Sequence, residues 1–253
     1  MHKFLRAVGF GSCRTRKELK EILDRVENEA ELIHVVHDNN GDVLAQKLIY
    51  VGRRIGLSVC GSIDEDDRFV REFYFPWHEG NCITTQAPCQ IQRQAEKAAF
   101  SGICDQKGLG VSLIYYVQNQ LAYLERELNE QNVSYLTSVM MSGLSVEGKI
   151  LLPTYRDAET KISLLQCEDL YTVVESTFMP YGVECDQYSI IGEITEVEIV
   201  TNQWTGEMVY SLTVNCNGLN FQVCINEQDL MGLPAPGRRF KGSIWMQGIC
   251  NMT

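Results

Sequence analysis

The sequence lacks several features that would assign it to a familiar class of protein. No apolar run approaches the ~20 residues that a helix needs to span a bilayer, and the first 20 residues lack the apolar core of a secretory signal. The ten cysteines include no CxxC pair, and most of them lie in apolar runs, where a reduced Cys packs as a small hydrophobic residue. We therefore expect a cytoplasmic protein with reduced, structural thiols and no membrane partner.

Positive charge is missing from a long part of the chain. The net charge is −11, and residues 162–237 hold 11 acidic residues but no Lys or Arg. Residues 1–161 are nearly balanced, with 19 basic and 22 acidic residues, and residues 238–253 hold three basic residues and no acid. An acidic stretch repels phosphate backbones and anionic membranes over about a Debye length. Nucleic acid is therefore disfavoured as a partner.

Helices and strands are interspersed without a regular rhythm in the first part of the chain. Apolar residues three and four apart between positions 19 and 26 predict a helix, for which Thr15 is a suitable N-cap. NNGD at residues 39–42, between two apolar runs, predicts a β-hairpin. Because no βαβ repeat is present, we predict an α+β domain over residues 1–183 rather than a doubly wound sheet.

Three further segments of this part have less distinct patterns. Residues 2–10 begin as a strand-like segment, and residues 135–153 indicate two strands joined near Gly143 or near residues 147–148. Residues 167–179 indicate a helix that Pro180 stops.

From residue 184 the pattern is that of an antiparallel β domain. Residues 189–200 form a long strand whose apolar positions change parity, as in a bulged or bent strand. Residues 208–216 and 219–225 alternate between apolar and polar around Asn217 and Gly218, a two-residue hairpin signal. A short helical turn and a final strand follow. We predict a small acidic antiparallel β-barrel or sandwich over residues 184–253, with an OB-like barrel as the nearest template, although only four of the five OB strands are clear.

Three stretches carry a resemblance to a known family: SGLSVEGKILLP, FMPYGVECDQYSIIGEI and INEQDLMGLPAPGRRFKGSIWMQG. Together with the opening MHKFLRAVGF, they resemble an uncharacterised clostridial (Firmicutes) family classed as a domain of unknown function. Many members have a charged helical insertion after the KILLP strand, and the short TYRDAETKISLL segment implies that it is missing here. The family supplies no known activity, so the resemblance leaves the function open.

One candidate site lies at the predicted domain junction, in PYGVECDQY. Its residues combine a thiol, a carboxylate and two phenols: Tyr181, Cys185, Asp186 and Tyr188. The acidic neighbours of Cys185 would raise the pKa of its thiol, so a buried structural Cys is the simpler interpretation. A site for a small molecule or a reaction, assembled here from distant segments, is the alternative.

A second group of residues forms a predicted structural charge cluster. The three cations of the last strand follow a segment without any base, so we expect them to pair with carboxylates on neighbouring strands. The prediction is an ion pair from Arg238 or Arg239 to Glu193, Glu196, Glu198 or Glu207, and Lys241 belongs to the same cluster. The alternation of the strand places Phe240 toward the core and Arg239, Lys241 and Trp245 on the other face.

Histidine and glycine motifs give little further support for chemistry. His34 and His37 are three positions apart on a strand, so they face opposite ways and do not form a metal pair. His78 is isolated in the sequence. GFGSC at residues 9–13 precedes a basic helix start, and an anion bound against its backbone N–H groups is a weak hypothesis. We expect no cofactor and no metal.

These observations favour a non-catalytic interaction or scaffolding protein that binds a protein partner or itself. The first alternative is a small-molecule binder or enzyme with its site at the domain junction. The second is single-stranded nucleic-acid binding through the barrel, which the acidic charge disfavours.

Overall fold

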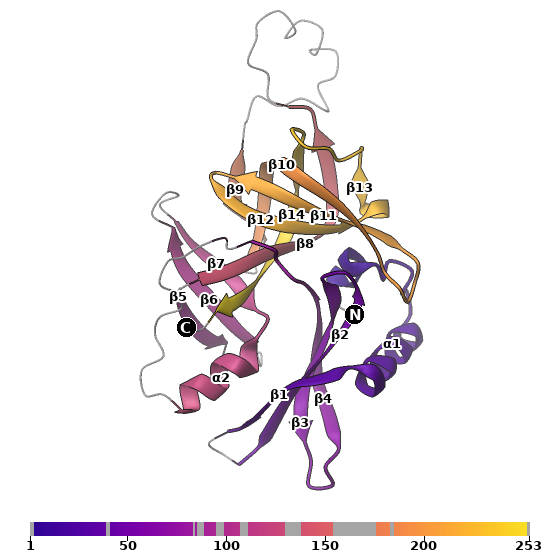
Figure 1. Cartoon of the computed structure of the whole chain (residues 1–253), viewed down its shortest axis with the longest axis vertical. Coiled ribbons are helices and arrows are strands. Elements are labelled where there is room, and N and C mark those ends of the chain that lie inside the picture. The colour runs from indigo at the N-terminus through magenta and orange to yellow at the C-terminus, as the bar shows by residue number, and fades with distance from the viewer. Residues whose placement is uncertain are drawn as a thin grey trace, which may run out of the picture.

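The computed structural model describes residues 3–38, 41–82, 84, 89–94, 99–106, 111–129, 138–153, 176–182 and 185–251. Within these residues the protein is mostly β, and its strands form a four-stranded sheet and a ten-stranded sheet (Figure 1). The larger sheet closes on itself in part, so that the molecule consists of a barrel with a separate sheet below it in Figure 1.

The chain begins with a short 3-10 helix, η1 (Lys3–Val8), and not with the predicted strand. Phe4, Leu5, Ala7 and Val8 are all buried, and their spacing follows a helical repeat rather than the two-residue repeat of a strand. The predicted helix is confirmed as α1 (Arg16–Glu29). Thr15 Oγ1 accepts a hydrogen bond from the Glu18 N–H at 3.2 Å and the Glu18 carboxylate accepts one from the Thr15 N–H, which makes a capping box.

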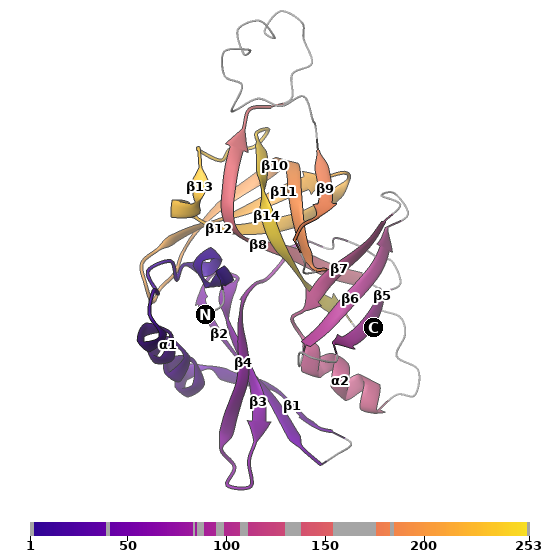
Figure 2. The same cartoon turned by 180° about the vertical axis from the view of Figure 1, so that it is seen from behind.

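The four-stranded sheet is an antiparallel meander of β1 (Glu31–His37), β2 (Val43–Gly52), β3 (Ile55–Ile63) and β4 (Phe69–His78). The predicted hairpin is therefore confirmed as β1–β2. α1 packs on one side of this sheet, and α2 (Gln120–Asn129) lies on the opposite side (Figures 1 and 2). The sheet has two edges, β1 and β4.

The barrel is a closed ring of five strands. They are β8 (Ser138–Leu151), β10 (Gln187–Thr201), β11 (Met208–Cys216), β12 (Leu219–Asn226) and β14 (Arg239–Asn251). Around the ring the order is β8, β12, β11, β10, β14 and back to β8. β8 and β12 run parallel, whereas the other four pairs are antiparallel.

Further strands extend the ring. β9 (Thr177–Pro180) pairs with β10, and β13 (Leu230–Met231) pairs with β8. β7 (Val111–Val117) pairs with β14, and β6 (Ala99–Gln106) and β5 (Cys89–Gln94) continue from it (Figure 2).

The observed strands differ from the predicted elements in two segments. Residues 138–151 form one strand, β8, and not two joined strands, because β8 pairs with β14 along almost its whole length. Of the predicted helix, Thr177–Met179 belong to strand β9, and residues 167–175 lie outside the described part. The predicted domain boundary at residues 183/184 stays a prediction, and β8, which precedes it, supplies the fifth strand that the sequence did not reveal.

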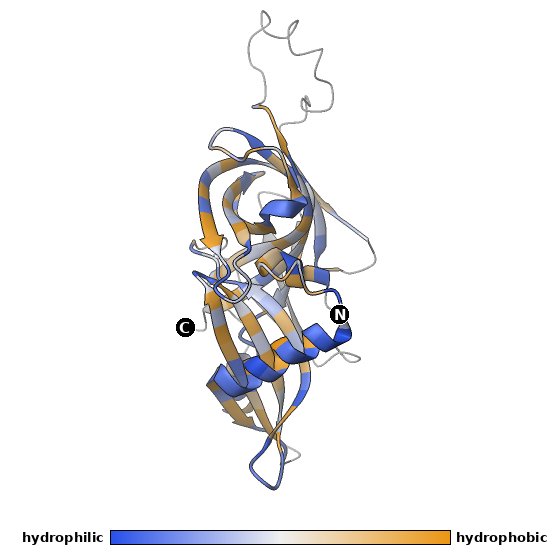
Figure 3. Ribbon diagram, turned by 90° about the vertical axis from the view of Figure 1, so that its right-hand side faces the viewer, coloured by the Kyte–Doolittle hydropathy of each residue, from blue (hydrophilic) through white to orange (hydrophobic). Residues whose placement is uncertain are grey.

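Two apolar clusters hold the molecule together. One fills the barrel interior, with Leu212, Val214, Phe221 and Phe240 fully buried, so the predicted inward position of Phe240 is confirmed. The other joins η1, α1 and the four-stranded sheet to the outer face of the barrel. In Figure 3 the strands of both parts carry hydrophobic residues, whereas α1 presents hydrophilic residues to the viewer.

Candidate functional site

The N-terminal part of the chain contacts the barrel through two features, the edge of β4 and the segment of residues 3–14. We call this contact the seam. β4 and η1 both lie against β8, and η1 also lies against β12. The seam joins residues from distant parts of the sequence. Many of the side chains that meet there are polar.

The β4 edge is bound by side chains of the barrel and of the segment that follows β7. The Pro76 carbonyl accepts a hydrogen bond from Gln247 Nε2 at 2.9 Å. The His78 carbonyl accepts bonds from Gln118 Nε2 at 3.0 Å and Ser142 Oγ at 2.6 Å. At alternate positions of an edge strand, the carbonyl points outward in the plane of the sheet, away from the neighbouring strand. Pro76 has no N–H, so this position leaves no unpaired donor at the edge. Side chains thus form the hydrogen bonds with these edge carbonyls that a fifth strand would otherwise form.

His78 itself is fully buried and lies next to Ser211. Its Nε2 is 3.0 Å from Ser211 Oγ, and its Nδ1 has no partner among the described residues. Burial, with a smaller contribution from the Arg54 charge, lowers the pKa of His78 to about 3. His78 is therefore neutral at pH 7. A hydrolytic triad needs a carboxylate on the second ring nitrogen and access for a substrate, so this buried pair is structural.

Buried amide side chains extend the seam. Gln118 Nε2 donates to Gln247 Oε1 at 2.8 Å, which links the two residues that bind the β4 edge. Gln46 Nε2 donates to Ser58 Oγ at 2.9 Å and to the Gln118 carbonyl at 3.0 Å. All four side chains are buried. In such a low-dielectric network each missing partner is costly, so the network fixes how the sheet sits on the barrel.

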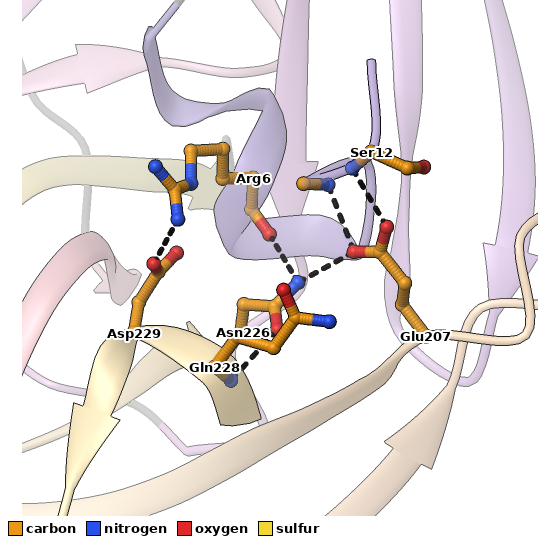
Figure 4. Close-up of polar contacts among 7 residues, drawn as sticks. Arg6, Ser12, Glu207, Asn226, Gln228 and Asp229 are labelled. Atoms are coloured by element: carbon orange, nitrogen blue, oxygen red, sulfur yellow. Dashed lines mark hydrogen bonds and ion pairs between the residues drawn. The ribbon is translucent and has the colours of Figure 1, made fainter. Parts of the chain in front are cut away.

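The second feature of the seam is the backbone of the N-terminal segment (Figure 4). Four successive carbonyls, at residues 6–9, accept hydrogen bonds from barrel side chains. The donors, in the order of the carbonyls, are Asn226 (3.2 Å), Cys224 (3.1 Å), Asn202 (2.8 Å) and Thr205 (2.6 Å). The barrel therefore binds this segment as it would bind a peptide, through its main chain.

The Glu207 carboxylate continues this contact (Figure 4). Its two oxygens accept the N–H groups of Gly11 and Ser12, each at 2.8 Å, and one of them also accepts Asn226 Nδ2 at 2.6 Å. An anion does lie against the N–H groups of GFGSC, but it is a carboxylate of the same chain, from the loop between β10 and β11. That position is thus filled from within.

Arg6, within η1, forms an ion pair with Asp229 (Figure 4). Asp229 belongs to η2 (Glu227–Asp229), the predicted helical turn, whose cap Asn226 accepts the Gln228 N–H at 3.0 Å. Burial raises the pKa of Asp229, and the Arg6 charge opposes that rise.

Aromatic and aliphatic packing completes the seam. Phe4 stacks on Trp245 with ring centroids 5.4 Å apart, and Tyr116 lies 5.0 Å from the same indole. Val209 and Cys224, on the outer faces of β11 and β12, are fully buried beneath the N-terminal part. Both faces of these two strands are therefore covered, one by the barrel interior and one by the seam.

The four predicted junction residues have different surroundings. Tyr181 and Cys185 are exposed. Asp186 Oδ2 accepts a hydrogen bond from Trp245 Nε1 at 2.8 Å, whereas the buried Tyr188 donates to and accepts from the backbone of one residue in β7. The contacts of the described residues join no two of these four side chains, and the small-molecule site built from them stays a prediction.

Arg238 and Arg239 differ from the predicted arrangement. Arg239 is only 2% exposed, and its Nε and Nη2 donate to the Leu152 carbonyl at 3.0 and 2.9 Å. Arg238 Nη1 donates to the Leu233 carbonyl at 2.7 Å. Among the ion pairs of the described residues, none joins either arginine to the predicted glutamates. The ion pair predicted for Arg238 or Arg239 stays a prediction.

The carboxylates of that cluster have other surroundings. Glu198 forms an ion pair with Arg53 at 2.8 Å, and Glu196 accepts the Thr213 hydroxyl at 3.1 Å. Glu193 is exposed and lies opposite Arg239 in the β10–β14 register, while Lys241 is also exposed. The single charge cluster of these residues stays a prediction.

His34 lies at the α2 side of the sheet, where its Nε2 is 2.6 Å from Glu125 Oε2. Within the described part of the chain no group of three or more His, Cys, Asp or Glu side chains is placed to hold a metal ion.

Sequence reasoning missed the seam. His78 has its partner Ser211 133 positions away, which no local pattern indicates. A signal was nevertheless present, because residues 219–226 contain apolar or uncharged side chains at both parities, as expected for a strand that is covered on both faces.

The fold and the seam define a β-rich protein in which a four-stranded sheet is fixed to a closed barrel by buried polar contacts. The chain belongs to the family described as "Domain of unknown function, E. rectale Gene description (DUF3881)", which matches residues 5–166 and 159–248. The resemblance to a clostridial family of unknown function is thus confirmed. No curated protein and no solved structure matches the chain. Among the described residues, no helix is long and apolar enough to cross a membrane.

Proposed function

We propose that the protein is a non-catalytic interaction protein in which the barrel is a scaffold that holds the four-stranded sheet for contact with protein partners. The seam is the observation that carries this proposal. Side chains of the barrel bind the carbonyls of residues 6–9, the N–H groups of Gly11 and Ser12, and the β4 edge. The outer face of β11 and β12 is thereby covered by the N-terminal segment of the same chain. The four-stranded sheet is then the surface that contacts other molecules.

The proposal includes an OB-like barrel with a permuted strand order. In the ring, β10, β11 and β12 form a meander, β12 runs parallel to β8, and β14 closes the barrel between β8 and β10. This is the OB order with the last strand moved to the front, and η2 lies between the third and fourth OB strands, where that fold has its helix. The chain would then combine an α+β N-terminal domain with this barrel.

The OB-like order is also the observation that favours a second function, binding of single-stranded nucleic acid. OB barrels bind oligonucleotides on the face of their second and third strands, which correspond to β11 and β12. Here that face carries the N-terminal segment, and the barrel lies in the acidic part of the chain. Salt-dependent binding of single-stranded DNA or RNA by the full chain would favour this second function.

Two matched pairs of surface substitutions test the leading proposal. Tyr50→Ser with Val70→Ser changes exposed side chains of the sheet, whereas Ile199→Ser with Met208→Ser changes exposed side chains of the barrel. Binding of a partner, identified by affinity capture and then measured with purified components, should weaken about tenfold or more in the first double variant, equivalent to about 1.4 kcal/mol. The second should bind as the natural chain does. The reverse result would contradict the proposal.

A cytoplasmic location is part of the same proposal. Among the described residues, Cys60, Cys82, Cys185, Cys216 and Cys224 are free thiols, which fits a reducing compartment. Burial raises the pKa of Cys60 and Cys216 to about 12, so these two thiols remain protonated and unreactive. Alkylation of the chain inside intact cells, followed by mass spectrometry, should find no disulfide.

A further inference from the structure

Two cysteines occupy opposite positions in the hairpin of β5 and β6. β5 is the terminal strand of the ten-stranded sheet, and β6 lies between β5 and β7 (Figure 2). Six successive residues of β5 pair antiparallel with six residues of β6, without a register shift. In this register Cys89, the first residue of β5, lies opposite Cys104. The backbone therefore brings two thiol-bearing residues of different strands to the same level of the hairpin.

The spacing of such a pair is suitable for a disulfide bond. Opposite residues of an antiparallel ladder have Cα atoms about 4.5 Å or about 5.5 Å apart, depending on their place in the hydrogen-bond pattern. Both separations lie within the range of about 4.4–6.8 Å that disulfides span. Opposite residues also lie on the same face of their sheet. A bond between Cys89 and Cys104 therefore needs no change of register.

The register distinguishes this pair from the other cysteines. In the strand ladders of the part that the structure describes, no other two cysteines are partners. Cys60, Cys216 and Cys224 are buried, and burial raises the pKa of each of these thiols. Because the thiolate is the reactive form, these three cysteines do not compete for an oxidant in neutral solution.

We propose that Cys89 and Cys104 form a reversible disulfide bond when the cell becomes oxidising. The oxidant is a low-molecular-weight disulfide of the glutathione type. The thiolate of one cysteine attacks this disulfide, forms a mixed disulfide and releases one small thiol. The thiolate of the other cysteine then attacks the protein-bound sulfur and releases the second small thiol. Two protein thiols are thus oxidised, one small disulfide is reduced, and the two protons of the protein thiols pass to the released thiols.

The geometry of an antiparallel pair also explains why the bond is reversible. Opposite Cβ atoms are about 4.5–5.5 Å apart, whereas the Cβ atoms of a disulfide are about 3.5–4.5 Å apart. The bond therefore pulls the two strands together, and a disulfide that is strained in this way is more easily reduced. Both thiols are then free in an unstressed cell, and oxidation joins the terminal strand β5 covalently to β6.

Treatment of the full folded chain with glutathione disulfide tests this bond. After alkylation of the remaining thiols and proteolysis, mass spectrometry should find two peptides joined through Cys89 and Cys104. An excess of reduced glutathione should remove the bond. In Cys89→Ser and in Cys104→Ser the bond should be lost, and the remaining cysteine should carry glutathione instead. Cys185→Ser, which changes an exposed thiol, is the matched control and should form the bond as the natural chain does.

Each variant is compared with the natural chain by its melting temperature, so that loss of the bond is not confused with a loss of folding. The proposal is overturned if Cys89 and Cys104 stay unlinked in the oxidised natural chain, or if either pairs with another cysteine. A bond that excess reduced glutathione leaves intact would also contradict it. The result is independent of the proposed partner contact, because β5 and β6 belong to the ten-stranded sheet and not to the four-stranded sheet.

Discussion

The two edges of the four-stranded sheet are treated in opposite ways by the rest of the molecule. At β4, the outward carbonyls of Pro76 and His78 accept hydrogen bonds from buried side chains of other segments, and the last four residues of the strand are buried. At β1, only one residue of seven is buried, and aliphatic side chains stay exposed.

The difference teaches how a β protein controls where strands can be added. An unpaired edge is protected when other groups satisfy its backbone, and Gln118, Ser142 and Gln247 do so for β4 without forming a strand. β1 has no such cover in the part of the chain that the structure describes, apart from α2 on one face. A sheet that is fixed at one edge and open at the other is suited to contact a protein partner through the open edge.

Acid should disturb the β4 edge most strongly. The pKa of His78 is about 3 in the folded protein, below its ordinary value of 6.5, so the stability that neutral His78 contributes is complete above pH 6.5. It is lost as the pH falls from 6.5 toward 3, by up to about 5 kcal/mol. Urea unfolding at several pH values measures this loss. Between pH 6 and 4, the slope of the free energy of unfolding against pH reports the number of protons taken up on unfolding, and His78→Gln should lower that number by nearly one. An unchanged slope would contradict the prediction.

Gln247→Leu should have the next largest effect. It leaves the Pro76 carbonyl and one Gln118 N–H without a partner in a buried setting, which costs about 2–3 kcal/mol in the free energy of unfolding. The matched control is Gln203→Leu at an exposed position, which should stay within about 0.5 kcal/mol of the natural chain. Equal effects of the two substitutions would show that Gln247 does not hold the β4 edge.

Glu207→Gln should weaken the N-terminal part of the seam. The amide keeps the shape of the side chain but presents an NH₂ group to a backbone donor, so we expect a loss of about 1–2 kcal/mol. Faster hydrogen exchange at Gly11 and Ser12 should accompany it. Glu193→Gln, at an exposed site in β10, should change neither quantity. Unaltered exchange at both glycine and serine in Glu207→Gln would contradict the assignment.

Substitutions at the open edge should have the smallest effect on stability. Val35→Ser removes an exposed methyl-bearing side chain from β1, and in dilute solution the free energy of unfolding should change by less than about 0.5 kcal/mol. Thermal unfolding measures it. A loss as large as that in Gln247→Leu would mean that the β1 edge is covered within the monomer.

Local signals in the sequence predicted local structure well. The capping box at Thr15 marks the start of α1, and Asn217 and Gly218 adopt the positive φ angles of 52° and 83° that the hairpin requires. The change of parity in β10 corresponds to a register shift between Ile194 and Glu196. Each of these features depends on residues that are close in the chain.

Contacts between distant residues were not predictable in the same way. β8 joins the barrel by pairing in parallel with β12 and antiparallel with β14, and neither pairing has a local signal. The charges of the last strand predicted ion pairs on the strand surface, whereas the buried Arg239 donates two hydrogen bonds to the Leu152 carbonyl, a contact that no local pattern indicates. His78 is isolated in the sequence because its hydrogen-bond partners come from three other segments, at Gln118, Ser142 and Ser211.

Hydrogen exchange measured by NMR on one dilute sample of the full chain tests the comparison of the two edges most directly. The side-chain NH₂ protons of Gln118 and Gln247 should exchange slowly, because they are buried and bound to the β4 edge. The backbone amides of Val35 and His37 should exchange within about tenfold of an unstructured peptide. Rapid exchange of both glutamine side chains, or strong protection of Val35 and His37 in the monomer, would contradict the account.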